Sequence, residues 1–241
     1  MKSPDRTELL ITVIARLLEG CRHVAVGASS PIPGSGALLA RSLSDGAMRV
    51  SVLGSRRNNF FTNGGVELFD LAAEGRIDAF FLGGGQIDGH GNINLVGVGT
   101  YPQVDVRWPG SFGSAYLYYL VPRVILFREE HTRRVMVPQV DFVSAPGTSE
   151  GVHRPGGPFA MVTGLGLFHF DRDHGRFRLE SVHPGHTVEE IRDNTGFEFD
   201  CPDTVPFTPV PSAETLTAIR GPIRDEIAET YPRFASQLTP A

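Results

Sequence analysis

The sequence predicts an α/β fold in which a mainly parallel sheet carries an antiparallel flank. In the first third of the chain, short apolar runs alternate with stretches whose apolar residues recur at helical spacing, as in successive strand–helix units. Residues 165–170 and 176–182 alternate strictly around the turn 171–175, which predicts an antiparallel hairpin. A chain of 241 residues can bury one large core, so we expect a single domain over residues 1–241.

The elements follow from local signals in chain order. Asp5-Arg-Thr-Glu8 has the spacing of a capping box, and Gly20 is placed to end the helix that follows it. Strands are predicted at 23–27, 48–53, 79–82 and 123–127. Further helices are predicted at 37–43, 66–73, 115–120, 187–194 and 213–230, with 28–36 as a loop.

Composition narrows the class of protein. Hydrophobic residues make up 41% and charged residues 20%, as in a globular protein, and the net charge of -5 argues against nucleic acid or a membrane as partner. Cys21 and Cys201 are the only cysteines, which fits the reducing cytoplasm. Asp5, Arg6 and Glu8 interrupt any signal-peptide core, so export is not expected.

Two glycine-rich loops point to a ligand site. The apolar run 79–82 ends in Gly83, Gly84 and Gly85, which lack Cβ atoms and so can adopt positive φ and bring backbone N–H groups close to a bound oxygen. Gln86 follows directly and adds a side-chain amide. The second loop contains Phe112 and precedes a predicted helix. Since ligands of open α/β sheets bind beyond the carboxyl ends of strands, these loops are candidates for substrate binding.

The same residues resemble a known family. Gly-Gly-Gly-Gln-Ile-Asp-Gly-His-Gly-Asn-Ile-Asn at 83–94 is similar to the GAQVD-x-x-GN-x-N loop of class I coenzyme A transferase β subunits. Pro-Gly-Ser-Phe-Gly-Ser at 109–114 resembles that family's GSGGAN segment. Further matches follow in the family's order at 131–134, 140–147, 162–171 and 183–197, so the resemblance covers roughly residues 20 to 220.

The resemblance implies a three-layer CoA-transferase-like fold, an acyl-CoA substrate, no cofactor other than that coenzyme A, and an α subunit as partner in an α2β2 heterotetramer. It also implies a nucleophilic glutamate of this chain at the end of the second strand. No glutamate occurs between Ala47 and Gly65, and Glu67 is the nearest one. The sequence therefore lacks the transferase nucleophile where the family carries it.

Family members that lack this glutamate include β chains of actinobacterial cholesterol-ring-cleaving hydrolases. By this resemblance, we expect a hydrolase or lyase of steroid degradation that opens a cyclic β-keto acyl-CoA by retro-Claisen cleavage, with its catalytic glutamate on the α subunit and no catalytic residue in this chain. Phe112 and the pair Phe60-Phe61 suit an alicyclic acyl group. One alternative is an ordinary CoA-transferase subunit for a dicarboxylic acyl group. Another is a non-catalytic scaffold or sensing subunit.

The remaining site residues are polar. Arg56, Arg57 and Asn58 follow the second strand, and a guanidinium grips a carboxylate with two parallel hydrogen bonds; a solvated basic loop is the alternative. His90 and His131 are the histidines nearest the loops, either as proton shuttles or as turn and structural residues. His183 and His186 have no third ligand at suitable spacing, so we expect no metal site.

Overall fold

The computed structural model describes residues 4–238 as two compact units, and each is considered by itself. The first unit comprises the described residues up to Phe81 and those from Pro209 onward, and the second comprises Leu82–Thr208. The expectation of a single domain over residues 1–241 stays a prediction.

The first unit contains the parallel strands that the sequence predicts. β1 (His23–Val26) lies between β2 (Arg49–Val52) and β3 (Ala79–Leu82), and both neighbours run parallel to it. Every residue of β1 and β3 is buried, which explains why they read as unbroken apolar runs. Because parallel strands end at a common edge, the loops after β1 and β2 leave from the same edge of the sheet.

The first helix confirms the predicted capping box. α1 (Arg6–Leu17) begins where Asp5 Oδ1 accepts a hydrogen bond from Glu8 N at 2.9 Å and Glu8 Oε2 accepts one from Asp5 N at 3.0 Å. Glu8 is also buried against Arg220, whose Nε donates to Glu8 Oε1 at 2.6 Å. One carboxylate therefore caps α1 and anchors the C-terminal segment of the same unit.

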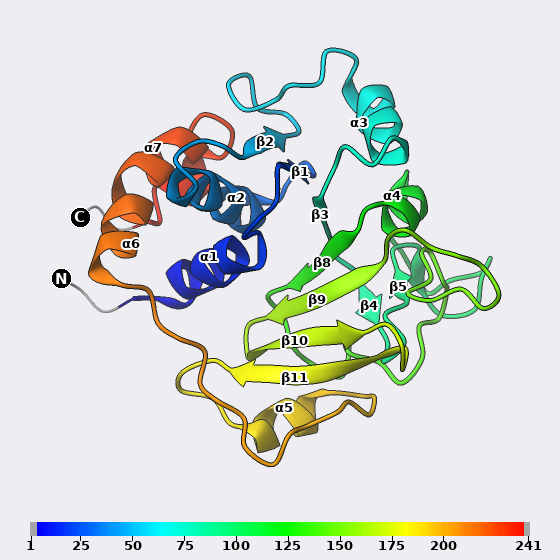
Figure 1. The fold of residues 1–241 in the computed structure, drawn as a ribbon. Helices are drawn as coiled ribbons and strands as arrows, with labels where there is room; N and C mark the ends of the chain where they lie inside the picture. Colours follow the sequence, from blue (N-terminus) through cyan, green and yellow to red (C-terminus); the bar gives the residue numbers. More distant parts are fainter. Residues whose placement is uncertain (1–3, 239–241) are drawn as a thin grey trace. The chain divides into compact units, whose positions relative to one another are not determined.

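The second helix starts earlier than the sequence predicts. α2 (Pro31–Leu43) includes residues 31–36, which were predicted as loop, and that prediction is wrong. Pro31 and Pro33 lie in the first turn, where the backbone N–H groups have no intrahelical partner and the fixed φ of proline suits a helix. Figure 1 shows α2 between α1 and the C-terminal helices. α3 (Gly64–Ala73) follows β2 near its predicted position.

The C-terminal helix predicted at 213–230 is interrupted. α6 (Ala213–Ala218) leads into a π-helical turn, Ile219–Ile223, before α7 (Arg224–Ile227), and α8 (Pro232–Ala235) follows. Gly221 leaves the helical region with φ -110° and ψ -105°, since Pro222 has no N–H and clashes with the preceding turn. The single-helix prediction is wrong because this Gly-Pro pair was passed over in an otherwise amphipathic stretch.

The second unit contains the predicted antiparallel hairpin and one strand that the sequence analysis missed. β8 (Arg123–Arg128) pairs in parallel with β9 (Pro158–Thr163), which pairs antiparallel with β10 (Gly166–Asp171), and β11 (Arg176–Val182) completes the hairpin. β9 was not predicted because five of its six residues are buried, which leaves no alternation to read. The parallel strands and the antiparallel flank are confirmed.

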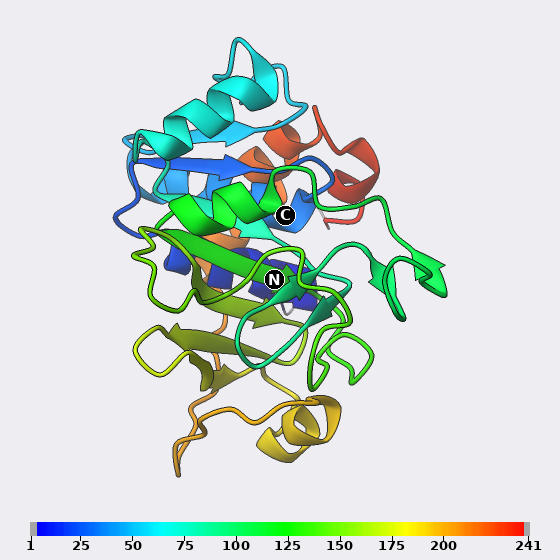
Figure 2. The same cartoon turned by 90° about the vertical axis from the view of Figure 1, so that its right-hand side faces the viewer.

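Small elements complete the second unit. α4 (Ser114–Leu120) and α5 (Val188–Asn194) lie where helices were predicted. Two short hairpins, β4 (Gln86–Ile87) with β5 (Ile93–Asn94) and β6 (Gly97–Val98) with β7 (Val106–Arg107), form the glycine-rich region. In Figure 2 the green arm that carries β6 and β7 extends away from the rest of this unit. No helix between residues 4 and 238 is long and apolar enough to cross a membrane.

The contact between α1 and α2 gives a stability prediction. A Cβ on Gly36 would lie 2.7 Å from Cβ of Ile14 and 3.1 Å from the carbonyl oxygen of Ile11. We expect Gly36→Ala to lower the free energy of unfolding by about 1–3 kcal/mol, because the helices must move apart. Gly34→Ala in the same helix is the control, since its Cβ would meet only the flexible end of Ile227 at 3.1 Å. Equal unfolding midpoints of the two variants in denaturant would contradict the prediction.

Candidate functional site

The basic loop after β2 is held by its own backbone and by Ser55. Asn58 O accepts from Val52 N at 2.6 Å, and Ser55 Oγ accepts from Asn58 N at 2.9 Å and from Arg57 N at 3.2 Å. Asn58 is buried, and its Oδ1 accepts from Arg41 Nη1 at 3.0 Å. Asn58 therefore shapes the loop from inside the protein.

The two arginines of this loop point a different way. Arg56 and Arg57 are exposed, and neither guanidinium forms an ion pair with another residue within the described part of the chain. Their backbone is fixed, so the two cations sit on a rigid turn at the carboxyl edge of the parallel strands. This arrangement suits the binding of an anionic group, as the sequence predicts.

Glu229 is a member of this region that the sequence analysis missed. Its Oε2 accepts from Ser55 Oγ at 2.7 Å and its Oε1 accepts from Arg56 N at 3.0 Å. These hydrogen bonds, that of Ser55 first, hold the pKa of Glu229 below its usual range, so the carboxylate stays ionised. The two ends of the contact lie 174 and 173 residues apart, and no local pattern in the sequence signals it.

The carboxylate nearest to β2 in sequence serves as a cap. Glu67 Oε2 accepts hydrogen bonds from Thr62 N at 2.6 Å, Thr62 Oγ1 at 2.9 Å and Asn63 N at 3.1 Å. These bonds, the Thr62 side chain first, lower the pKa of Glu67. Glu67 thus closes the N-terminal turn of α3 onto the preceding loop, which is a structural role.

In the second unit, the three glycines are needed for close approach rather than for unusual φ. None of Gly83, Gly84 and Gly85 has positive φ, so the conformational reason given from the sequence is wrong. A Cβ on Gly84 would lie 2.7 Å from Gln86 O, and one on Gly85 would overlap the indole ring of Trp108. Trp108 is the only tryptophan of the chain, and its packing on Gly85 was not foreseen.

The backbone of this loop is partly committed. Gly85 N donates to Asn94 O at 2.9 Å, which closes the β4–β5 hairpin. The oxyanion prediction for this loop consequently rests on the N–H of Gly84, next to a glycine, Gly83, that is exposed.

Gln86 lies in an internal hydrogen-bond network. Its Nε2 donates to Asp141 Oδ2 at 3.0 Å, while its Oε1 accepts from Asn94 Nδ2 at 2.7 Å and from Asp141 N at 2.9 Å. Asp141 Oδ2 also accepts from Gly99 N at 2.9 Å. Gln86 therefore positions the loop through Asp141, while direct contact between Gln86 and a substrate stays a prediction.

Phe112 is the most exposed large apolar side chain of the described residues, at 93% exposure, and its φ is 41°. A bulky residue at positive φ is strained, and such strain gathers at functional loops. Of the other predicted aromatics, Phe60 is 50% exposed, whereas Phe61 is 7% exposed and packs near His23 at 5.9 Å between ring centroids. Phe112 and Phe60 can meet a ligand, and Phe61 belongs to the core.

The predicted residues divide between the units. Arg56, Arg57 and Asn58 belong to the first unit, and Gly83, Gly84, Gly85, Gln86 and Phe112 belong to the second. Within the second unit, the hairpin and Trp108 bring the glycines and Gln86 into one loop cluster.

The histidines have structural environments. His131 is buried between Thr163 and Thr195, with 2.8 Å from Nδ1 to Thr163 Oγ1 and 2.9 Å from Nε2 to Thr195 Oγ1. His90 is exposed in the turn that Asp88 Oδ1 closes by accepting from His90 N at 3.0 Å. His183 is buried, and no group of three or more metal-ligating side chains occurs between residues 4 and 238.

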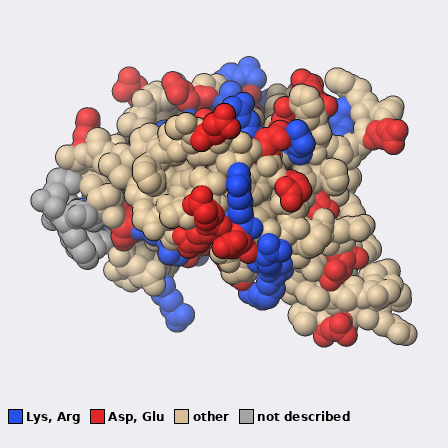
Figure 3. All heavy atoms as spheres, turned by 90° about the horizontal axis from the view of Figure 1, so that it is seen from below, with Lys and Arg blue, Asp and Glu red and all other residues tan. Residues whose placement is uncertain are grey.

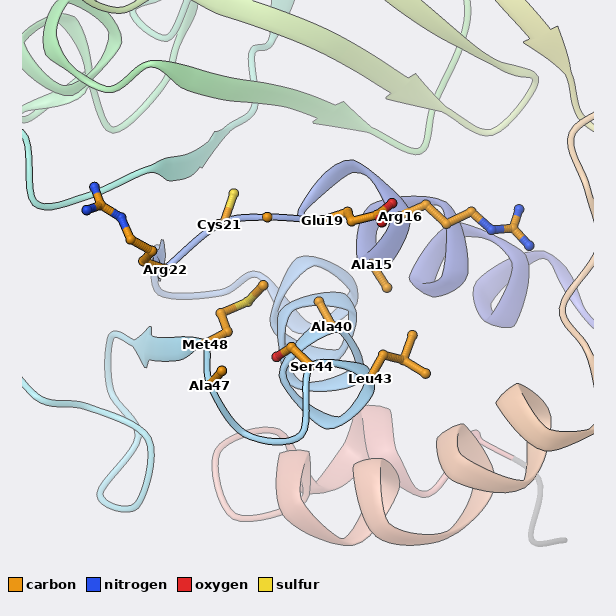
Figure 4. A pocket seen from close by; sticks show the side chains of 11 residues that line it. Ala15, Arg16, Glu19, Cys21, Arg22, Ala40, Leu43, Ser44, Ala47 and Met48 are labelled. Carbon is orange, nitrogen blue, oxygen red and sulfur yellow. The ribbon is translucent and has the colours of Figure 1, made fainter.

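A pocket of about 450 Å3 lies in the first unit, where the C-terminal ends of α1 and α2 meet the start of β1. Figure 4 shows Leu43 and Met48 among its lining residues, with Arg16 and Arg22 extending away from it. Arg16 donates instead to Pro209 O at 2.8 Å, and Arg22 to Asp78 Oδ1 at 3.1 Å. None of the predicted site residues lines this pocket.

Glu229 gives a prediction for the basic loop. In Glu229→Gln one oxygen becomes an amide donor, so the side chain can no longer accept from both Ser55 Oγ and Arg56 N. We expect amide hydrogen exchange of Arg56 to become roughly five- to tenfold faster. Asp225→Asn is the control, because this exposed carboxylate pairs with Arg224 and not with the loop. Unchanged exchange in Glu229→Gln would rule out the bracing role.

His131 gives a prediction on pH. Burial lowers the pKa of His131 to about 4, as it does for His23, whereas an unfolded histidine titrates near 6.5. Between these values the unfolded chain binds more protons, so each histidine destabilises the fold as pH falls below 6.5. We expect each to cost on the order of 2 kcal/mol between pH 7 and pH 5. Urea unfolding at both pH values should show a smaller loss in His131→Gln than in the unsubstituted chain, and an equal loss would contradict this assignment.

Comparisons with known proteins bear on the family. The family model of the coenzyme A transferases matches residues 8–194. One of the two subunits of the 3-oxoadipate CoA-transferase of Pseudomonas knackmussii is 31% identical over 214 residues, covering 86% of this chain and 80% of that protein. The cholesterol ring-cleaving hydrolase IpdB subunit of Rhodococcus jostii is 33% identical over 159 residues, covering 64% of this chain and 62% of that subunit.

Solved structures show the same fold. The structure of IpdAB from Rhodococcus jostii RHA1 matches with a TM-score of 0.81 and 26% identity, covering 91% of this chain and 94% of that one. The decarboxylase AibA/AibB matches with a TM-score of 0.78 over 98% of this chain and 99% of that one, but at 23% identity this likeness concerns the fold alone. The predicted CoA-transferase-like fold is confirmed, and the chain belongs to the coenzyme A transferase family.

Proposed function

We propose that this chain is the β subunit of an α2β2 enzyme that opens the ring of a cyclic β-keto acyl-CoA by hydrolysis, with the catalytic glutamate on the α subunit. The acyl group would come from the C and D rings of a steroid, and the location would be the cytoplasm. The observation that carries this proposal is the missing glutamate after β2, where the chain continues as Leu-Gly-Ser-Arg-Arg. A family member without its nucleophile cannot form the glutamyl-CoA intermediate of the transferases in this chain.

The carboxylates near the strand end support this reading. Glu67 caps the N-terminal turn of α3, and Glu229 braces the loop of Arg56, so both carboxylates hold structure. A nucleophile for an acyl-CoA would have to leave such hydrogen bonds before it could attack. The catalytic carboxylate is therefore sought in the partner.

The names of the relatives point in two directions. The IpdB subunits are named for cholesterol ring cleavage, and IpdAB is named as a complex of two subunits. The 3-oxoadipate relative is named for CoA transfer and is also a subunit. Both support an α subunit as partner, and the missing glutamate favours the hydrolase over the transferase.

In this proposal the chain binds and polarises the substrate. Arg56 and Arg57 hold a carboxylate of the substrate. The N–H of Gly84 stabilises the negative charge that develops on an oxygen during cleavage, and Phe112 contacts the alicyclic ring. The CoA moiety is part of the substrate, so no separate cofactor is needed.

The reaction balances with water alone. Hydroxide from water, activated by the partner's carboxylate, adds to the ring ketone carbon. The bond between that carbon and the carbon next to the thioester carbonyl breaks, and its electron pair forms the thioester enolate, which takes up a proton. The product carries a new carboxylate and an intact CoA thioester.

The decisive experiment starts with the native mass of the tagged chain recovered from its own host, where we expect an equimolar complex with a second chain. The complex is then given a cyclic β-keto acyl-CoA in isotopically labelled water. Mass spectrometry should find a product that has gained one water, with the label in the new carboxylate. CoA transfer to an added acid, with a CoA thioester on Glu67 or another acid of this chain, would establish the transferase instead.

The role of the arginine loop is tested in the same complex. We expect Arg57→Ala to lower kcat/KM by roughly 10- to 100-fold, since it removes charge-assisted hydrogen bonds to the substrate. Arg76→Ala is the control, because this exposed arginine of the first unit pairs with Glu74 and lies outside the loop. Full activity of both Arg57→Ala and Gly84→Val in the assembled complex would instead identify a non-catalytic scaffold.

A further inference from the structure

A second pocket, of about 420 Å3, lies in the second unit, beside the C-terminal end of α5. It is lined by Arg133, Arg192 and the segment 195–199, none of which belongs to the candidate substrate site. Figure 3 views the molecule from the side on which α5 lies in Figure 1, and basic and acidic side chains gather close together there.

The two arginines of this pocket have donors to spare. Arg133 Nε donates to Asp193 O at 2.7 Å, which fixes the guanidinium at the end of α5 and leaves both of its terminal nitrogens for a ligand. Arg192 is exposed in the last turn of α5. Neither arginine forms an ion pair with any residue that the structure describes. Two guanidiniums thus border one cavity without a carboxylate bound to them.

The floor of the pocket is main chain, because the neighbouring rings are used elsewhere. The Phe197 ring packs against Phe177 at 5.9 Å between centroids, and the Phe199 ring meets Phe168 edge-on at 5.3 Å. The backbone N–H groups of residues 197–199 donate to no acceptor within the described residues. Successive free N–H groups in a concave surface are a recurrent way of binding anions.

One acid also lines the cavity. Glu198 contributes a carboxylate, so the three charged side chains of the lining carry two positive charges and one negative charge. A dianion gains more from the two arginines than it loses to Glu198, whereas a monoanion gains less, as Coulomb's law requires. The pocket is therefore suited to a doubly charged oxyanion.

From this cavity, its unpaired guanidiniums and its free backbone donors, we infer a binding site for a phosphate group, distinct from the residues assigned to the substrate. Phosphate accepts parallel hydrogen bonds from guanidinium and further bonds from backbone N–H groups. The inference does not rest on the proposed function, since it uses only contacts within the second unit.

The pocket is connected to the glycine-rich loop through backbone contacts. Gly196 N donates to Met136 O at 2.7 Å, and the same segment pairs with β4, where Val137 N donates to Ile87 O at 3.0 Å. Phe197 also packs on Gly89, where a Cβ would lie 3.1 Å from the ring. A phosphate bound to residues 195–199 would therefore restrain the chain that supports the β4–β5 hairpin.

The test measures binding of inorganic phosphate and of adenosine 3′,5′-bisphosphate to the purified chain at constant ionic strength, by titration calorimetry. We expect Arg133→Ala and Arg192→Ala each to weaken phosphate binding at least about tenfold, and Glu198→Gln to strengthen it several-fold. Arg134→Ala is the matched control, because this exposed neighbour pairs with Glu130 at 2.7 Å and does not line the pocket.

The two probes separate the sources of the phosphate group. If the bisphosphate binds more tightly than free phosphate and competes with it, the site takes the phosphate of a nucleotide. If free phosphate binds as well, the site takes the free anion. Phosphate affinity that is unchanged in the Arg133→Ala/Arg192→Ala double variant, or equally reduced in Arg134→Ala, would overturn the inference, and unfolding curves of each variant show whether the fold is intact.

Discussion

The hydrogen bonds between the glycine-rich hairpin and segment 140–147 are the constraint on which the second unit's candidate site depends. Gln86 and Asp141 bind each other twice, through Gln86 Nε2 at 3.0 Å and Asp141 N at 2.9 Å. Asn92 Oδ1 accepts from Gly147 N at 3.0 Å further along the same segment. Buried polar groups must be paired, so these side chains fix the register of the hairpin. The glycines can then stay open, because neighbouring side chains supply the rigidity.

The first unit uses the same principle with charges. Glu229 holds the loop of Arg56 through two hydrogen bonds, and Arg41 reaches Asn58 from α2. The arginine side chains are thereby left to solvent while their backbone is fixed. A preorganised cation binds an anion at a lower entropy cost than a mobile one. The loop is consequently better suited to recognition than an ordinary basic surface turn.

The chemistry follows from what these constraints leave available. Near β2, the carboxylates Glu67 and Glu229 are both committed to holding loops. The family's nucleophile is missing from the strand end, so this chain offers binding groups and backbone donors. A division of labour between two subunits accounts for both facts. It also explains how one fold can serve transferases, hydrolases and decarboxylases, since the chemistry resides in a few loop residues.

The sequence by itself determined the family, the strand–helix order, the hairpin 165–182 and the capping box of α1, because each depends on local spacing or on a run of residues. Only the tertiary structure decided which polar groups are free to act. Glu229 reaches Ser55 across 174 residues, Trp108 packs on Gly85, and His131 is enclosed by Thr163 and Thr195. These contacts join segments that carry no mutual signal in the sequence, and burial and hydrogen bonding between them exist only once the chain has folded.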